Sequence, residues 1–481
     1  MSASYDNLFI GGQWAPPTST RTIVVHNAST GEHIGTVPEA AEADVDAAVA
    51  AARRAFDDPS GWSSWAPAER AAALERLATE LDSRAAEIGR LVSMQNGMPI
   101  ALSPLIEGMT PVGTLRYVAS LLATAPVEEE TSRFLGGDLV IRHEPIGVIA
   151  GIVPWNYPQT LSSFKYAPAL AAGNTIVLKP SPETVLDSYV FAEAVIAASI
   201  PPGVVNIVPG GRDIGAYLVQ HRDIDKVAFT GSTAAGRQIA EACGRLLRPV
   251  SLELGGKSAA IILDDADLDL AKIGQNLFAA TLVNNGQTCY AGTRILAPRS
   301  RYAEVVDVFA AFASSLPVGD ALDPATLIGP LVAERQRDRV ERYIAKGISD
   351  GARLVTGGGR PAGLDRGWFL EPTIFADVDN KSTIAQEEIF GPVLSVIEYT
   401  DEDDAVRIAN ESDYGLGGSV WTSDNDRARS VIRRVRTGTM GINSYLPDPA
   451  GPWGGVKASG LGRELGPGAV AAYQNLKTVY A

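Results

Sequence analysis

One of the two cysteines of this 481-residue chain lies in a polar segment that glycines interrupt, residues 284–294. Cys289 is flanked there by asparagine, glutamine, threonine and glycine residues, whereas a buried structural cysteine normally has apolar neighbours. This setting favours a cleft in which a thiolate can form and react. The segment therefore predicts a nucleophilic cysteine, and the rest of the chain has to supply its base and its substrate site.

Two further residues could do chemistry with that sulfur. Glu253 lies between two leucines and before a glycine pair, which suggests a carboxylate aimed into a cleft, although a half-exposed strand gives the same alternation. Asn156 follows Trp155 and precedes Tyr157. It could donate its amide to an oxyanion or simply support a turn. The four histidines are scattered without metal-ligand spacing, so we predict no metal site.

The charge balance and the chain start restrict the partners. With 41 basic and 56 acidic residues the formal charge is −15, which argues against binding to nucleic acid or an anionic membrane. Two cysteines cannot form a disulfide framework and fit a reducing cytosol. The first residues carry no secretory signal, and no apolar run approaches the length of a membrane span. We expect a soluble, cytoplasmic protein.

The elements from residue 146 onwards repeat a strand, a turn and a helix, which is typical of a doubly wound, Rossmann-like α/β fold. Helices are predicted between strands that we place at 147–153, 175–179, 204–208, 226–230 and 258–263. Ligands of such sheets lie beyond the carboxyl ends of the strands. The residues there are Trp155, Asn156, Lys179, Ser181, Gly231 and Ser232.

Other segments complete the expected architecture. Short strands are predicted between residues 8 and 37, followed by helices at 43–56 and 68–91, and a projecting hairpin is predicted near 127–142. A second α/β unit is expected from about 267 to 441. The final strand, 476–480, has no obvious partner in its own domain, which invites pairing with another subunit.

The usual G-x-G-x-x-G dinucleotide fingerprint is missing. The nearest match, residues 357–362, runs into Pro361 and is interpreted as a turn. The segment 229–236 follows a strand and opens a helix, so its amides could receive a phosphate, although an ordinary capped turn is the alternative. Lys179 could bond a ribose or a phosphate, or be a surface lysine.

Seven segments in order resemble the aldehyde dehydrogenase superfamily over nearly the whole chain. They are PWNYP (154–158), KPS (179–181), FTGST (229–233), LELGGKS (252–258), GQTC (286–289), EEIFGPV (387–393) and PWGGVKASGLGRE (452–464). The resemblance implies that Cys289 is the nucleophile, Glu253 the general base and Asn156 an oxyanion donor. It implies that an aldehyde is oxidised through a thiohemiacetal and a thioester, which water activated by Glu253 hydrolyses to the free acid.

The resemblance also implies an NAD(P) site without the glycine fingerprint. The cofactor residues expected from it are Trp155, Lys179, Ser181, Gly231, Ser232, Gly236, Leu254, Gly255, Glu388 and Phe390. Many relatives that prefer NAD carry Glu three residues after the lysine, where this chain has Pro182, and its acid, Glu183, comes one place later. We expect NAD, with NADP possible, because the loop offers no basic residue beyond Lys179 to a 2′-phosphate.

The motifs also indicate a pocket and domain bounds. Aromatic and hydroxyl side chains suited to apolar or aryl aldehydes are expected at Tyr157, Phe164, Thr288, Tyr290, Tyr445 and Trp453. We assign residues 1–122 and 146–254 to an NAD(P)-binding domain and residues 255–450 to a catalytic domain. Residues 123–145 and 464–481 form a small β oligomerisation element, which predicts a homodimer or homotetramer.

Two alternatives remain open at this point. Cys289 and Glu253 could serve a cysteine-dependent esterase or acyltransferase without redox chemistry, which would turn over esters and bind no dinucleotide. The chain could also be a catalytically idle structural relative that keeps the fold. Intact Cys289, Glu253 and Asn156 argue against the idle relative.

Overall fold

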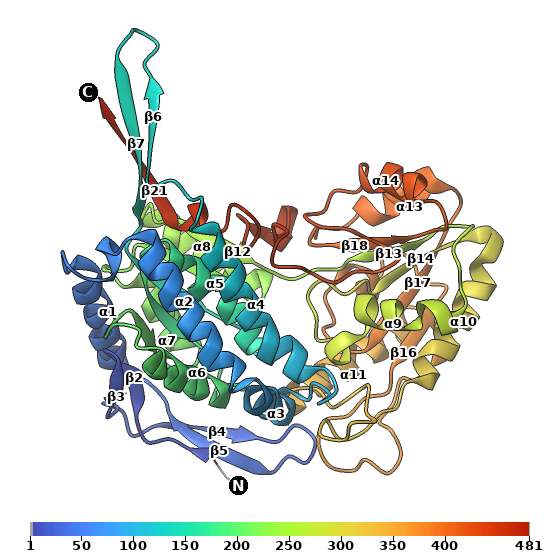
Figure 1. Ribbon diagram of the computed structural model, residues 1–481. Coiled ribbons are helices and arrows are strands. Elements are labelled where there is room, and N and C mark those ends of the chain that lie inside the picture. Colours follow the sequence, from blue (N-terminus) through green and yellow to red (C-terminus); the bar gives the residue numbers. More distant parts are fainter. Residues whose placement is uncertain (1–2, 481) are drawn as a thin grey trace.

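The computed structural model describes residues 3–480 and contains two α/β units side by side, each built on one large sheet (Figure 1). Residues 1, 2 and 481, which the predicted domain ranges include, lie outside the described residues. The strand order is β20-β12-β11-β8-β9-β10-β2-β3 in the first sheet and β15-β16-β17-β14-β13-β18-β19 in the second. The predicted α/β class is confirmed.

The first sheet has five adjacent parallel strands with β8 at the centre, which is the doubly wound pattern. Its strands are β2 (Leu8–Ile10), β3 (Gln13–Ala15), β8 (Val148–Ile152), β9 (Thr175–Lys179), β10 (Val205–Ile207), β11 (Lys226–Thr230), β12 (Val250–Glu253) and β20 (Gly460–Leu461). Successive strand residues enter opposite cores: Ile149 packs in one cluster, and Val148 and Ala150 pack in the other.

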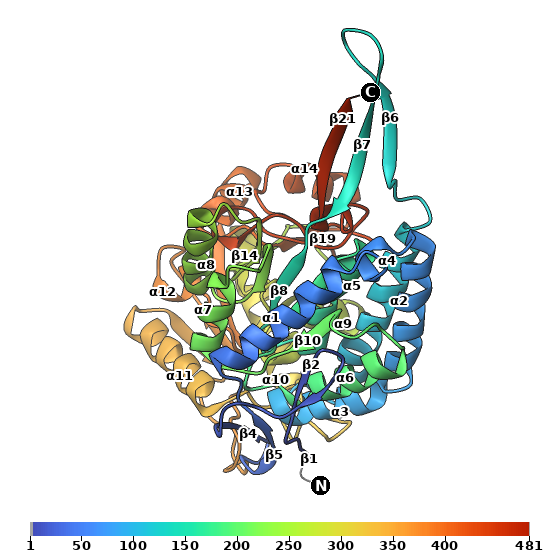
Figure 2. The ribbon, with the colours of Figure 1, turned by 90° about the vertical axis from the view of Figure 1, so that its left-hand side faces the viewer.

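Helices cover both faces of this sheet. The core that contains Ile149 also takes α2 (Pro67–Asp82), α4 (Thr110–Leu121), α5 (Pro158–Ala171) and α6 (Leu186–Ala197). The core that contains Val148 takes α1 (Glu42–Asp57), α7 (Arg212–Gln220) and α8 (Thr233–Arg245). The short strands β1 (Ala3–Ser4), β4 (Thr22–His26) and β5 (His33–Pro38) form a separate sheet below them (Figure 2).

The second sheet is parallel except at β15. Its strands are β13 (Ala259–Ile262), β14 (Arg294–Pro298), β15 (Arg353–Thr356), β16 (Thr373–Ala376), β17 (Val393–Tyr399), β18 (Gly418–Trp421) and β19 (Gly441–Ile442). The helices of this unit are α9 (Leu270–Thr281), α10 (Tyr302–Ser315), α11 (Glu334–Ser349), α12 (Thr383–Gln386), α13 (Glu402–Asn410) and α14 (Asn425–Ile432). The first two pack on one face and the other four on the opposite face.

Three sequence-based expectations are corrected. The strand predicted at 258–263 is β13 of the second sheet, and the first sheet uses β12 instead. The helix predicted over 68–91 is two helices, α2 and α3 (Ala85–Asn96). It breaks where the side chains of Ser83 and Arg84 both donate to the Glu80 carbonyl oxygen, at 2.8 Å each, and such bonds compete with the helical ladder.

The third correction concerns the last strand. β21 (Gln474–Tyr480) pairs along its whole length with β7 (Asp138–Pro145) of the same chain, whose other side pairs with β6 (Glu128–Ser132). These three strands form an arm that projects from the first unit, and this confirms the predicted hairpin (Figures 1 and 2). The strand therefore has a partner in its own chain, and its second edge remains the outer edge of the arm.

Candidate functional site

The loop that carries Cys289 follows α9 as a 3₁₀ turn, Val283–Gly286, and its backbone is unusual. Asn284 and Asn285 adopt positive φ angles of 52° and 59°, which asparagine tolerates better than most residues. A Cβ atom at Gly286 would lie 2.3 Å from the Gly391 carbonyl oxygen. Glycine at this position therefore allows the loop to approach the backbone of Gly391 closely.

The polar side chains before Cys289 are buried and anchor the loop. Asn285 donates to the carbonyl oxygens of Gly97 and Pro330, at 2.8 Å each, and accepts from the Gly329 amide at 2.7 Å. Gln287 accepts from the Val332 amide at 2.9 Å. The polarity that the sequence showed around the thiol is therefore the polarity of a fixed loop, because buried polar groups need such partners.

Asn156 lies beyond the carboxyl end of β8 and is bonded to this loop. Its side-chain amide donates to the Gln287 carbonyl oxygen at 3.0 Å, and Asn284 donates to the Asn156 carbonyl oxygen at 2.9 Å. Asn96 at the end of α3 supports the same carbonyl at 2.8 Å. The structure thus brings Asn156 next to the segment two residues before Cys289, although the two lie far apart in the sequence.

Glu253 is the last residue of β12 and is only 4% exposed. Burial raises the pKa of its carboxyl well above the usual value, and the negative charge of Glu464 raises it further. Lys165, the Gly455 amide and Arg463 oppose that shift. A carboxylate with a raised pKa is suited to take and return a proton near neutral pH.

Lys165 and Glu464 form a buried ion pair behind Glu253 that the sequence analysis missed. The Lys165 ammonium donates to Glu464 at 2.8 Å and to the Thr230 hydroxyl at 2.6 Å. The feature that could have indicated this ion pair is the lysine itself, which lies in α5, a helix whose fourteen residues are all buried. A lysine with no exposed surface needs an acidic partner.

The Cys289 thiol lies within the field of two carboxylates. Burial raises the pKa of the thiol strongly, and the charges of Glu253 and Glu388 raise it further. The backbone amides of Cys289 and Tyr290 act in the opposite direction. The thiol is therefore protonated at neutral pH without a ligand, and it needs a base to become a thiolate.

A cleft of about 1070 Å³ lies at the carboxyl ends of the first sheet, where both units contribute residues. Five residues expected at a cofactor site line it: Trp155, Lys179, Ser181, Gly231 and Ser232. Its volume is slightly above the roughly 300–1,000 Å³ of ligand pockets. Ser232 caps α8 by accepting from the Ala235 amide at 3.3 Å, so a helix N-terminus suited to a phosphate opens onto the cleft.

The other five expected cofactor residues contact one another and the cleft lining. A Cβ atom on Gly236 would lie 2.4 Å from the Leu254 side chain, so glycine lets α8 pack on that leucine. Glu388 accepts from the Gly256 amide at 3.0 Å and lies against Gly255. Phe390 meets Trp155 edge to face, with ring centroids 5.2 Å apart.

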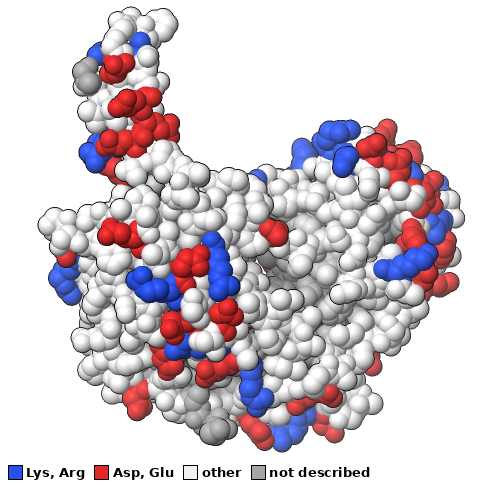
Figure 3. Space-filling model, in the orientation of Figure 1, with Lys and Arg blue, Asp and Glu red and all other residues white. Residues whose placement is uncertain are grey.

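Five of the six residues expected in a substrate pocket are buried in one cluster with Cys289 against it, and the sixth, Thr288, is also buried. Tyr290 meets Tyr445 and Trp453 edge to face, at centroid distances of 5.1 Å and 5.8 Å. The hydroxyls of Tyr157 and Thr288 are 2.6 Å apart. The surroundings of the thiol are therefore mainly aromatic, with a small hydroxyl group beside it. In the hollow between the two units charged side chains are sparse (Figure 3).

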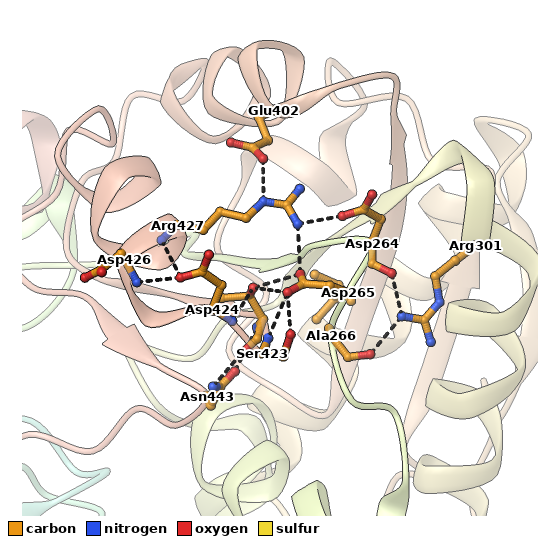
Figure 4. Close-up of polar contacts among 12 residues, drawn as sticks. Asp264, Asp265, Ala266, Arg301, Glu402, Ser423, Asp424, Asp426, Arg427 and Asn443 are labelled. Atoms are coloured by element: carbon orange, nitrogen blue, oxygen red, sulfur yellow. Dashed lines mark hydrogen bonds and ion pairs between the residues drawn. The ribbon is translucent and has the colours of Figure 1, made fainter.

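A second polar cluster follows β13, an inner strand of the second sheet (Figure 4). Arg427 contacts Asp264, Asp265 and Glu402 at 2.7, 2.9 and 2.6 Å, and Asp265 also accepts from the Ser423 hydroxyl at 2.6 Å. These partners join α13 and α14 to the strand, so the cluster is explained as a tertiary contact. Within residues 3–480 no group of histidine, cysteine and acidic side chains is arranged to hold a metal ion.

A dinucleotide-sized cleft on a doubly wound sheet, together with a half-buried thiol in the field of a buried carboxylate, defines the class as an NAD(P)-dependent dehydrogenase. The model of the aldehyde dehydrogenase family matches residues 14–479, so the chain belongs to that family. The predicted enzyme class is confirmed.

Individual relatives cover the chain end to end. It is 54% identical to the geranial dehydrogenase of Castellaniella defragrans over 100% of this chain and 99% of that protein. A Mycobacterium tuberculosis aldehyde dehydrogenase, solved with NAD+, is 49% identical, with a TM-score of 0.97 over 100% of this chain and 98% of that one. Aldehyde dehydrogenase C of Pseudomonas syringae, solved as a mutant with NAD+ and octanal, is 40% identical, with a TM-score of 0.94 over 98% and 96%.

Proposed function

We propose that this chain oxidises apolar aldehydes to carboxylic acids with NAD, with Cys289 as nucleophile, Glu253 as base and Asn156 as oxyanion donor. The aromatic cluster against Cys289 carries the proposal, because Tyr290, Tyr445 and Trp453 offer apolar surface and carry no charge. The names of two relatives, which specify geranial and octanal, support it.

The first step begins with the thiol of Cys289 and the carboxyl of Glu253, whose pKa values are both raised. Glu253 takes the proton of Cys289, and the sulfur then attacks the aldehyde carbon, so that a C–S bond forms and the carbonyl oxygen becomes an oxyanion. The Asn156 amide and the Cys289 backbone N–H would donate to that oxygen. Because the Asn156 amide already donates one hydrogen to Gln287 at 3.0 Å, its orientation is fixed and its second hydrogen is available.

The cleft that Lys179, Ser181 and Ser232 line fits an extended dinucleotide. When bound there, NAD supplies the acceptor for the hydride that leaves the thiohemiacetal carbon. Glu388, Phe390 and Trp155 at the inner end would fix the reacting part of the cofactor. Glu253 first releases to solvent the proton that it took from Cys289, and it then takes a proton from a water that attacks the thioester carbon. The C–S bond breaks, the acid is released, and Glu253 returns its proton to the Cys289 sulfur.

An aldehyde panel tests the substrate class. With NAD, we expect kcat/KM for hexanal, benzaldehyde and longer apolar aldehydes to exceed that for glyceraldehyde by about 10²-fold or more, because each buried methylene stabilises the bound state. Absorbance of the reduced nicotinamide gives the rates. A polar aldehyde that exceeds hexanal and benzaldehyde would overturn the substrate class. Ester turnover without any dinucleotide binding would favour the esterase alternative.

The pH dependence of kcat/KM should reveal the effect of the Glu464 charge on the pKa of Glu253. In Glu464→Gln a negative charge that raises the pKa of Glu253 is removed while Lys165 stays, so the pKa falls. Glu253 acts as a base only when it is ionised, and the acidic limb of kcat/KM should therefore move to lower pH. Steady-state rates across pH measure this shift. An unmoved or upward-shifted limb would contradict the role of Glu253 as the base.

The arm supports self-association. β21 is the outer strand of its sheet, and Leu476, Val479 and Tyr480 are 68%, 42% and 71% exposed. Such an edge offers backbone donors and acceptors as well as apolar surface. We assign it to contact with a second copy of this chain, in a homodimer or homotetramer.

Light scattering after size-exclusion chromatography tests this assignment. Leu476→Lys with Val479→Lys should lower the assembly mass, because lysines block edge pairing. Ile348→Lys, at a residue 50% exposed on α11, is the matched control and should leave the mass unchanged. Equal masses for all three proteins would reject the arm as the interface.

Two broader assignments remain proposals. The NAD(P)-binding domain of residues 1–122 and 146–254 is supported by β2 and β3, which join the sheet of β8–β12. β20 also joins that sheet, although residues 451–463 were left outside all the predicted ranges.

A cytoplasmic location is supported by Cys243 and Cys289, which are both unpaired thiols, and cell fractionation would test it. Among residues 3–480 no helix has the length and apolarity of a membrane span.

A further inference from the structure

The loop that carries Cys289 belongs to the second unit, and two of its side chains bond to the first unit. Asn285 donates to the Gly97 carbonyl oxygen at 2.8 Å. Gln287 donates to the Asn96 carbonyl oxygen at 3.3 Å. Asn96 and Gly97 lie at the end of α3, a helix that packs in a core of the first unit. These two bonds therefore cross the junction between the units.

The same two side chains are also bonded to their own unit. Asn285 donates to the Pro330 carbonyl oxygen at 2.8 Å and accepts from the Gly329 amide at 2.7 Å. Gln287 accepts from the Val332 amide at 2.9 Å. These three partners lie just before α11 of the second unit. Each side chain therefore holds both units at once, four and two residues before the nucleophile.

At this junction the two backbones are in direct contact. A Cβ atom on Gly97 would lie 2.1 Å from the Pro330 carbonyl oxygen, and one on Gly329 would lie 2.1 Å from the Gly97 carbonyl oxygen. Asn285 is fully buried, and its φ of 59° is in the left-handed region, which asparagine tolerates. Opening of this contact would break the bonds to α3 and free the loop from the first unit.

The residues of the proposed mechanism are divided between the units in the same way. Asn156 and Glu253 lie at the carboxyl ends of β8 and β12 in the first sheet, whereas Cys289 belongs to the second unit. Proton transfer and stabilisation of the oxyanion need these groups within hydrogen-bond reach. Because a misplacement of about 1 Å can lower a rate by about 10²-fold, the reaction requires that the junction be fixed.

We propose that Asn285 and Gln287 are positioning residues, which bridge both units and so place Cys289 against the catalytic groups of the first unit. This inference rests on the proposed roles of Cys289, Asn156 and Glu253. All the bonds of the two side chains are to backbone groups. They therefore act on the arrangement of the two units and not on the reacting atoms. Their loss should slow the chemical steps and uncover the thiol.

Asn285→Gly tests this role, because glycine keeps the left-handed backbone and removes the three side-chain bonds. With an apolar aldehyde, kcat should fall by about 10-fold to 10²-fold and KM should change less, since Asn285 bonds to no residue of the pocket. Alkylation of Cys289 by iodoacetamide, measured by mass spectrometry in a Cys243→Ser background, should at the same time become several-fold faster. The loop then shields the thiol less, and the charge of Glu253, which raises the pKa of the thiol, lies farther away.

The matched control is Asn174→Ala. Asn174 is also fully buried, donates to the carbonyl oxygens of Ala169 and Tyr473 at 3.1 and 2.9 Å, and accepts from the Gly147 amide at 2.8 Å. It lies at the amino ends of β8 and β9, on the side of the sheet opposite the cleft. The control should lower the unfolding temperature about as much as Asn285→Gly does, because the same set of bonds is lost. Its kcat and its alkylation rate should match those of the parent chain.

Gln287→Ala loses one bond to each unit and gives an independent measurement, in which both rates should change in the same directions. A kcat within about twofold of the parent in Asn285→Gly would refute the proposal, as would an alkylation rate that does not rise or equal changes in Asn174→Ala. Cys289→Ser separates the two assumptions. If Cys289→Ser keeps oxidation, the nucleophile assignment fails and the positioning role fails with it. If Cys289→Ser is inactive while Asn285→Gly keeps its kcat, only the positioning role fails.

Discussion

Replacement of Cys289 by serine should lower aldehyde oxidation by at least about 10³-fold, because a serine hydroxyl is a far weaker nucleophile than a thiol near neutral pH. The side chain packs against a buried cluster with Glu253 and Glu388 nearby, and a hydroxyl needs a stronger base than these acids provide. The rate of formation of reduced nicotinamide, with a saturating apolar aldehyde, measures the loss.

The folding of Cys289→Ser should be nearly unchanged. The loop is held by Asn285 and Gln287 through bonds to Gly97, Pro330 and Val332, and none of these bonds involves the sulfur. Unfolding temperature and NAD affinity should therefore match the parent chain. Cys243→Ser, at the other cysteine, is the control and should keep the activity. Oxidation retained in Cys289→Ser would reject the nucleophile.

The order of the motifs along the chain predicted which residues lie close together in the fold. It did not predict the hydrogen bonds that fix them in place. Lys179, Ser181 and Ser232 follow strands of the first sheet, and the doubly wound rule brings such residues to one edge. The polar residues around Cys289 predicted a cleft in which a thiolate can form. They are buried anchors, because their partners, such as Gly97 and Pro330, lie in distant loops that no local pattern connects.

The parts that the sequence did not predict depend on long-range packing. Lys165 and Glu464 are 299 residues apart and bond in the interior, so neither residue signals the other in the sequence. Arg335 and Glu183 are 152 residues apart and meet across the cleft. The strand β12 ends at Glu253 and lies inside the sheet, whereas the sequence left open whether this carboxylate points into a cleft or alternates on a half-exposed strand. In each case the contact is made by the tertiary fold.

Glu253→Gln should lower steady-state turnover by about 10²–10⁴-fold, the range for loss of a general base. Hydrolysis should suffer most, because water is a poor nucleophile without a base, whereas a thiol is intrinsically a strong nucleophile, and the variant also removes one of the two carboxylate charges that raise the pKa of Cys289. A first turnover should therefore give a burst of reduced nicotinamide and leave an acyl group on Cys289. Stopped-flow absorbance and mass spectrometry of the intact chain detect the two products.

A strong external nucleophile separates this role from a structural one. Hydroxylamine attacks a thioester without a base, so it should restore turnover in Glu253→Gln but not in Cys289→Ser. Glu464→Gln is the matched control, since it changes the field at Glu253 and keeps the carboxylate. It should show no accumulated acyl group. If Glu253→Gln neither accumulates the thioester nor responds to hydroxylamine, the base acts before hydride transfer only, and another group has to activate the hydrolytic water.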